Sequence, residues 1–334
     1  ASEIDHTATL SLTSYQNIQR VEDPEGNELA ETVRFSTRWS ENTSNFVGEV
    51  SAGIESIRFT EEIDDNRNEG DLNANLLWIL SPNRYEWALT DVYTHTVIDP
   101  RLSDTALNRQ YINAFSTGPN INWRLAKTTY IEVQPRIEDY RFENDLLNNQ
   151  KANTRIEWIQ TPSVSTSYGI DVFYETTNYT SSSLVDSDYD QKELNFNIGY
   201  IRDNLSIQAS NGITKIDSNN YDSNNTTQYR LYIKNQRTES SSIELAAGKN
   251  VSDTAQAVIL SLAIDSNITL SASNDIYTNQ YASISYSKSY RNLDLIIDAE
   301  KRDEDYFTQN NLDRKVDSGT ISLQWINTSN SSFR

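Results

Sequence analysis

Apolar and polar residues alternate with a period of two along most of this chain, most plainly over residues 193–213. Leu194, Phe196 and Ile198 alternate with polar neighbours, and the alternation resumes after residues 202–204. A period of two is that of a β-strand whose two faces meet different surroundings, so this stretch predicts two strands joined by a tight turn. The apolar face then meets either a protein core or a lipid bilayer.

Roughly eighteen such segments follow one another, and their connections alternate between short and long. The short connections are expected at 41–44, 81–84, 125–127, 161–163, 202–204, 238–240, 265–267 and 290–292. Acidic or Asn-rich connections are expected at 21–28, 60–70, 97–108, 142–150, 181–191, 217–225 and 301–315, with shorter members of the same class near 250–254 and 278–280. Bacterial outer-membrane barrels have tight periplasmic turns and longer extracellular loops, whereas a soluble sandwich has no reason for this rhythm.

The fold class predicted is all-β, a closed antiparallel transmembrane β-barrel of about 18 strands in a single domain over residues 1–334. Sixteen strands are the alternative, because the turn signals between residues 241 and 280 are weak. Hydrophobic residues make up only 36% of the chain, too few to fill the core of a soluble β-protein with so many strands. The apolar face is therefore expected to meet lipid, and the inner face a wet lumen, in a bacterial outer membrane.

Five of the six tryptophans adjoin short connections and the sixth ends the last segment, so all six fall at the turn end of the segments. They are Trp39, Trp78, Trp87, Trp123, Trp158 and Trp325. Indole rings prefer the boundary between membrane and water, so these residues predict a periplasmic aromatic girdle. The alternative is that aromatic residues simply favour strands, which would scatter them over both ends.

Composition excludes several classes of function. A net charge of −20 speaks against nucleic-acid binding, and the lack of cysteine excludes thiolate-bound metal. His6 and His95 are the only histidines, so we expect no enzyme, no catalytic residues, no metal site and no cofactor. The chain also has no methionine, so residue 1 is expected to be a processed end, as after a cleaved signal peptide; an artificial boundary is the alternative.

Residues 80–119 carry a more specific pattern: Ser81-Pro82, Trp87, Asp99-Pro100, Asn108-Arg109-Gln110, Asn113 and Phe115-Ser116-Thr117-Gly118-Pro119. This progression resembles the outer-membrane β-barrel family associated with exosortase (PEP-CTERM) systems and exopolysaccharide gene clusters. The resemblance implies an outer-membrane protein of polysaccharide secretion that acts as the exit pore. It also implies a periplasmic polysaccharide-export lipoprotein as a partner.

If apolar residues point outward, a set of basic and aromatic side chains points into the lumen. The predicted pore-lining and polymer-binding residues are Arg34, Arg38, Arg109, Arg124, Tyr130, Arg136, Arg155, Phe173, Arg230, Tyr232 and Lys234. Arginine binds carboxylate or sulfate in a bidentate manner, and aromatic faces suit sugar rings. The alternative is that these charges pair with lumen acids across neighbouring strands and stiffen the wall.

Two local features are expected near the middle of the barrel. Pro119 and Pro135 fall opposite each other in one hairpin and predict a bulge or kink there, since proline cannot donate to a ladder. The preceding connection, residues 97–108, is expected to fold inward and narrow the pore, with Arg109 reaching into the lumen.

Two hypotheses of function follow. The first is an outer-membrane pore that exports an exopolysaccharide or capsular polymer through a polar, arginine-containing lumen. The second is a passive porin, either anion-selective or general. The lipid bilayer, lipopolysaccharide and a polysaccharide are the expected partners.

Overall fold

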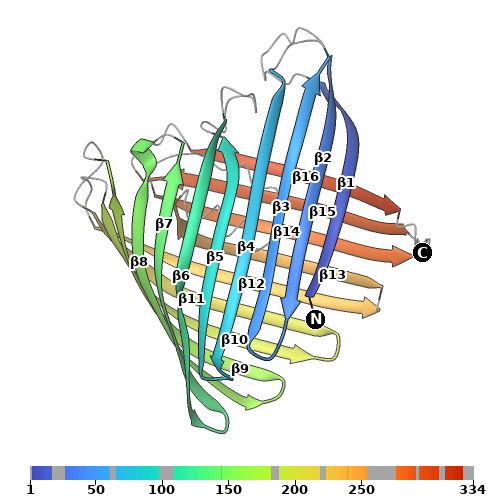
Figure 1. The fold of residues 1–334 in the computed structure, drawn as a ribbon. Coiled ribbons are helices and arrows are strands. Elements are labelled where there is room, and N and C mark those ends of the chain that lie inside the picture. Colours follow the sequence, from blue (N-terminus) through green and yellow to red (C-terminus); the bar gives the residue numbers. More distant parts are fainter. Residues whose placement is uncertain are drawn as a thin grey trace.

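The structure of the chain is a computed structural model, in which residues 2–16, 27–60, 65–97, 109–143, 145–181, 188–218, 223–238, 240–253, 276–290, 293–307 and 313–325 are described. These residues form one antiparallel sheet of 16 strands in sequence order (Figure 1). The first eight strands are β1 (Ser2–Gln16), β2 (Asn27–Asn42), β3 (Phe46–Phe59), β4 (Arg67–Ser81), β5 (Tyr85–Val97), β6 (Arg109–Ala126), β7 (Thr129–Phe142) and β8 (Asn149–Ser163). The other eight are β9 (Thr166–Tyr179), β10 (Tyr189–Arg202), β11 (Leu205–Ser218), β12 (Asn224–Thr238), β13 (Ser241–Ser252), β14 (Tyr277–Tyr290), β15 (Leu293–Tyr306) and β16 (Arg314–Trp325). A short 3-10 helix, η2 (Asp145–Leu147), precedes β8.

The predicted all-β, antiparallel barrel architecture is confirmed. Each strand pairs with its neighbours in the chain, as in an up-and-down barrel, and the sheet curls round so that its two halves face each other (Figure 1). β1 and β16 stand at the two ends of this order, and no ladder joins them within the described residues. Both strands have their free termini at the end of the sheet that carries the short turns.

The predicted rhythm of connections is present throughout the described chain. Every even-numbered strand before β16 is followed by a turn of two or three residues, and every odd-numbered strand by a longer connection. Asn83 and Asp203 lie in two of the short turns with φ of 58° and 47°. Asn and Asp tolerate this left-handed conformation better than other non-glycine residues, so local sequence fixes these turns.

The strand count of 18 is where the sequence prediction differs from the structure. β13 pairs with β14 over the whole length of β13, from Ser241↔Lys288 to Ser252↔Tyr277, so no strand is inserted between them. Of the two shorter members expected in the acidic class, the one at 278–280 is wrong, because Asn279 lies within β14. A connection does begin within 250–254, since β13 ends at Ser252. The expected turn at 265–267 lies outside the described residues. The sixteen-stranded alternative is the one that the described residues show.

The two faces of the sheet differ in chemistry as predicted. On β10, Leu194, Phe196 and Ile198 share one face with Ile213 of β11, and all four side chains are about half exposed. The other face is the inner one, because Lys151 on β8 contacts Asp253, which follows β13 on the far side of the sheet. An apolar outer face of this kind is stable against the lipid tails of a bilayer. A sheet can cross a bilayer only when its strands pair into a barrel, because unpaired backbone groups are costly in lipid. The architecture therefore places the chain in an outer membrane.

No helix in the described residues is long and apolar enough to span a bilayer.

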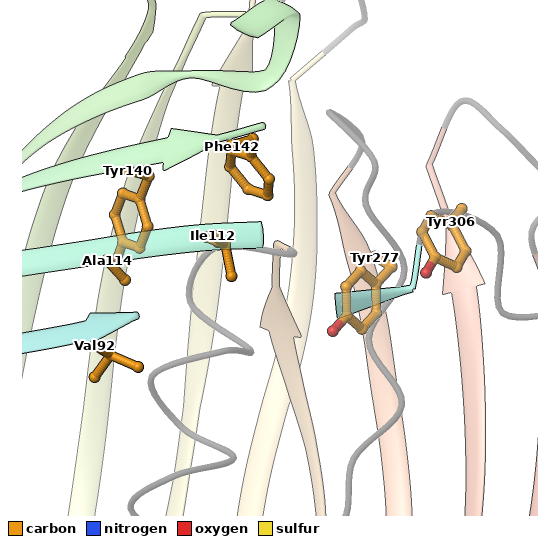
Figure 2. Close-up of a cluster of buried hydrophobic side chains, with 7 residues drawn as sticks. All are labelled: Val92, Ile112, Ala114, Tyr140, Phe142, Tyr277 and Tyr306. Carbon is orange, nitrogen blue, oxygen red and sulfur yellow. The ribbon is translucent and has the colours of Figure 1, made fainter. Parts of the chain in front are cut away.

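Buried apolar side chains gather at the end of the sheet that carries the long connections. One cluster joins β5–β7 to β14 and β15 and consists of Val92, Ile112, Ala114, Tyr140, Phe142, Tyr277 and Tyr306 (Figure 2). A second comprises Tyr189, Ile216, Val251 and Ile276. Both clusters contain residues that face inward by strand parity, so the interior is packed at this end.

The hairpin of β6 and β7 shows how the two prolines are accommodated. Thr117↔Ile137 and Ile121↔Val133 keep one register, which places Pro119 opposite Pro135, but the ladder is interrupted between these pairs. The expected irregularity is thus a gap in the ladder, without the register shift of a bulge. Arg136 spans the gap: its Nη1 donates to the carbonyl oxygens of Pro119 and Pro135, each at 2.9 Å.

Candidate channel lumen

Acidic side chains outnumber basic ones on the inner face. By strand register the inward acids are Glu3, Asp5, Glu49, Glu55, Glu69, Asp71, Glu86, Glu132, Glu138, Glu157, Asp171, Glu175, Glu193, Glu244, Asp294, Asp298, Glu300 and Glu304. The inward bases are Arg34, Arg38, Arg67, Arg124, Arg136, Lys151, Arg155, Arg230, Lys234, Arg302 and Arg314. The potential along this wall is therefore negative on balance, which favours cations in the lumen.

Five of the eight predicted pore-lining bases hold a carboxylate of another strand. Arg34 lies 2.6 Å from Asp71 and 3.4 Å from Glu55, and Arg38 lies 2.8 Å from Glu49. Lys234 lies 2.5 Å from Glu244, which also accepts a hydrogen bond from Tyr232 at 2.9 Å. The structure thus shows the cross-strand pairing that was the alternative reading of these charges.

Arg155 and Phe173 form a local unit on the inner wall of β8 and β9. The guanidinium carbon of Arg155 lies 5.4 Å from the centre of the Phe173 ring, and its Nε lies 3.2 Å from Asp171. Stacking and ion pairing together fix the orientation of the guanidinium. Both residues lie on the inner face by strand register, and their role in lining a pore stays a prediction.

The remaining predicted residues have different surroundings. Arg124 donates to the carbonyl oxygens of Ala126 and Lys127, so it closes its own turn at the end of β6. Tyr130 faces inward opposite Arg124. Arg230 faces inward on β12, and it has no ion pair within the described part of the chain.

Arg109 lies at the long-connection end of β6, with its side chain largely buried. Its Nη1 contacts both carboxylate oxygens of Glu69, at 2.7 and 2.8 Å. Glu69 also lies 3.1 Å from Arg67 and 3.3 Å from His95. The connection 98–108, which was expected to fold inward, lies outside the described residues, so its path stays a prediction.

Lys151 is the centre of a site that the sequence analysis did not single out. Its Nζ is fully buried and lies 2.6 Å from Asp253, 3.0 Å from Glu175 and 3.2 Å from the Tyr189 hydroxyl. The rings of Tyr140 and Tyr189 lie 5.6 and 5.7 Å from the same nitrogen. The alternation of side chains along β8 predicts that Lys151 points inward. Its partner Asp253 follows β13, and this contact cannot be predicted from the sequence because it forms only when the sheet folds.

The tryptophans lie where the sequence places them. Trp78 pairs with Trp87 near the turn between β4 and β5, and Trp123 and Trp158 lie near the next two short turns. Trp39 donates to Ser2 at 3.2 Å, and Trp325 pairs with Leu293. Their assignment to the periplasmic side of the membrane stays a prediction.

The two histidines lie on different strands, His6 on β1 and His95 on β5. His6 Nδ1 lies 3.0 Å from the Thr37 hydroxyl on the outer face, and His95 lies beside Glu69. No group of three or more potential metal ligands is present among the described residues.

Neither a protein-family profile nor a curated protein sequence matches the chain. Among solved structures, OccAB3 of Acinetobacter baumannii is 9% identical, with a TM-score of 0.48 over 97% of this chain and 98% of that chain. OccAB2 of the same organism is 8% identical, with a TM-score of 0.47 over 97% of each chain. OccK11 (OpdR) of Pseudomonas aeruginosa is 8% identical, with a TM-score of 0.45 over 97% and 94%. At these values the function has to be argued from the chain itself.

Proposed function

We propose that this protein is a porin-type channel that lets small polar solutes diffuse across the bacterial outer membrane and prefers cations to anions. The observation that carries the proposal is the inner wall, where polar and charged side chains line every strand and acids outnumber bases. Barrels of sixteen to eighteen strands enclose an aqueous passage. Neither a cofactor nor a chemical step is needed for this function.

Two observations favour diffusion of small solutes over polymer export. Arg34, Arg38 and Lys234 are occupied by carboxylates, so they offer no continuous basic track to an anionic polymer. At the long-connection end, the contact between Lys151 and Asp253 and the buried apolar clusters occupy interior space that a polymer needs. Polymer export with a periplasmic lipoprotein is supported by the resemblance of residues 80–119 to the exopolysaccharide-associated barrel family. An anion-selective lumen is not favoured, because inward acids outnumber inward bases.

Ion selectivity tests the proposal directly. We expect the purified protein, inserted into a planar bilayer under a KCl gradient, to give stepwise conductance. The sign of the reversal potential should show that K⁺ permeates more readily than Cl⁻. Neutralising Asp294, Asp298 and Glu300 on the inner face of β15 should reduce that potential. The matched control is Asp303→Asn, which removes one acid from the outer face of the same strand beside Lys315.

A reversal potential of the sign set by Cl⁻, or no conductance, contradicts the proposal. Surface polymer on a strain that lacks the protein separates the two functions. We expect unchanged polymer, whereas loss from the surface with periplasmic accumulation supports export.

A further inference from the structure

We propose that the inner wall between β8 and β13 holds a binding subsite for a small zwitterion, a solute with an ammonium group at one end and a carboxylate at the other. The inference rests on the proposed function, because it names a class of solute for the same lumen. Two features of the wall carry it: a recess between these strands, and charges of opposite sign at its two ends.

The recess has a volume of about 120 Å³, and most of its lining residues face inward by strand register. Its lining includes Glu157, Glu193, Asn195, Arg230 and Lys249. An apolar cavity of about 150 Å³ holds benzene in another protein, so the recess holds about six non-hydrogen atoms, and its open side lets a longer molecule extend beyond it.

Side chains of neighbouring strands lie over two glycines at the recess and form its floor. A Cβ at Gly212 would lie 2.0 Å from Asn195 Oδ1 and 2.3 Å from the Leu194 carbonyl oxygen. A Cβ at Gly248 would lie 2.9 Å from the Tyr281 ring. Because Gly212 has no side chain, Gln228 on β12 reaches across β11 and donates to Asn195 Oδ1 on β10 at 2.7 Å. The floor of the recess is therefore a fixed set of amides.

The end of the recess toward β8 and β10 is acidic. Glu193 accepts hydrogen bonds from Gln191 at 2.7 Å and from Gln228 at 3.1 Å, and Glu157 accepts one from Asn197 at 3.3 Å. Within the described residues, no cationic side chain lies within 4.0 Å of either carboxylate. Amide donors fix the positions of these carboxylates without neutralising them, so an ammonium group that enters here gains charge-assisted hydrogen bonds. Arg155, which also lines the recess, is paired with Asp171.

The end toward β12 and β13 is basic. Arg230 opposes Gly248 across the ladder, so no side chain on β13 covers it at that level. Arg230 has no ion pair in the part of the chain that the structure describes, and it is the basic group of this end, because Lys249 pairs with Tyr229 and faces outward. A guanidinium group binds a carboxylate with two parallel hydrogen bonds. A zwitterion supplies the missing counter-charge at both ends, whereas a simple amine or a simple acid supplies it at one.

Calorimetry on the detergent-solubilised full chain tests the subsite with three probes of equal length: 5-aminopentanoate, pentylammonium and pentanoate. We expect 5-aminopentanoate to bind most tightly. The double variant Glu157→Gln/Glu193→Gln and the single variant Arg230→Gln should each weaken its binding about tenfold, the loss of one charge-assisted contact. Asp298→Asn, an inward acid outside the recess, should leave the affinity unchanged.

Equal affinity for the three probes, absence of binding heat, or equal binding by Arg230→Gln and the native chain overturns the inference. Because Arg230 has no ion pair to lose, that variant remains informative if the double variant fails to fold. Cation-selective conductance without binding of 5-aminopentanoate refutes the subsite and leaves the channel function standing. Binding without conductance supports the subsite and refutes the channel function.

Discussion

Replacement of Lys151 by methionine should destabilise the barrel more than replacement of any exposed lysine. The side chain is fully buried, and its ammonium group is the charge that Glu175 and Asp253 face at 3.0 and 2.6 Å. Methionine fills similar space but leaves the two buried carboxylates, 1% and 3% exposed, without that cation. Removing one partner of a buried ion pair costs about 3–5 kcal/mol, most of it from the uncompensated charge that remains.

The free energy of unfolding can be measured by denaturant titration of the protein folded in lipid vesicles, with tryptophan fluorescence as the signal. We expect Lys151→Met to lower it by about 3–5 kcal/mol. The matched control is Lys301→Met on the outer face of β15, where the lysine and Asp317 are 71% and 76% exposed and 3.9 Å apart. That exposed pair contributes about 0–1 kcal/mol, so the control should be nearly neutral.

The triple variant Lys151→Met/Glu175→Gln/Asp253→Asn separates charge from packing. It removes the three buried charges together, so much of the lost stability should return. A single variant as stable as the Lys301 control would refute the reasoning, because Lys151 would then not compensate these carboxylates. A triple variant as unstable as the single one would show that shape, and not charge, sets the cost.

Two further changes probe the glycines and the two faces of the wall by the same titration. Gly212→Ala should lower the free energy of unfolding by about 1–3 kcal/mol through overpacking against Asn195. The control is Gly70→Ala, whose Cβ would meet nothing closer than 3.7 Å and which should be neutral or stabilising. Equal effects of the two changes would contradict the close approach at Gly212. Ile198→Arg on the outer face should cost about 2–4 kcal/mol if that face meets the centre of the bilayer. Gln208→Arg on the inner face of β11 should cost little, and the reverse order would show that the faces have been assigned wrongly.

The sequence determined the local architecture because strands and tight turns depend on neighbouring residues. The alternation around Leu194 and Phe196 predicted which face is apolar, and the turns at Asn83 and Asp203 have the left-handed backbone that Asn and Asp accept. The opposition of Pro119 and Pro135 followed from counting residues back from one turn. The direction of Arg155, Phe173 and Tyr232 followed from parity in the same way.

Tertiary structure alone decided which residues meet across strands and across the lumen. The sequence predicted extra strands between Asn250 and Asn279, but strand pairing is a long-range choice, and β13 and β14 pair directly. Lys151 finds Asp253 at a separation of 102 residues, which no periodic pattern encodes. Whether an inward arginine is available to a solute depends on the side chains of other strands. Arg34 forms an ion pair with Asp71, whereas Arg230, which lies opposite Gly248, has no ion pair among the described residues. Period two fixes the face of each side chain, and the register between strands fixes its neighbours.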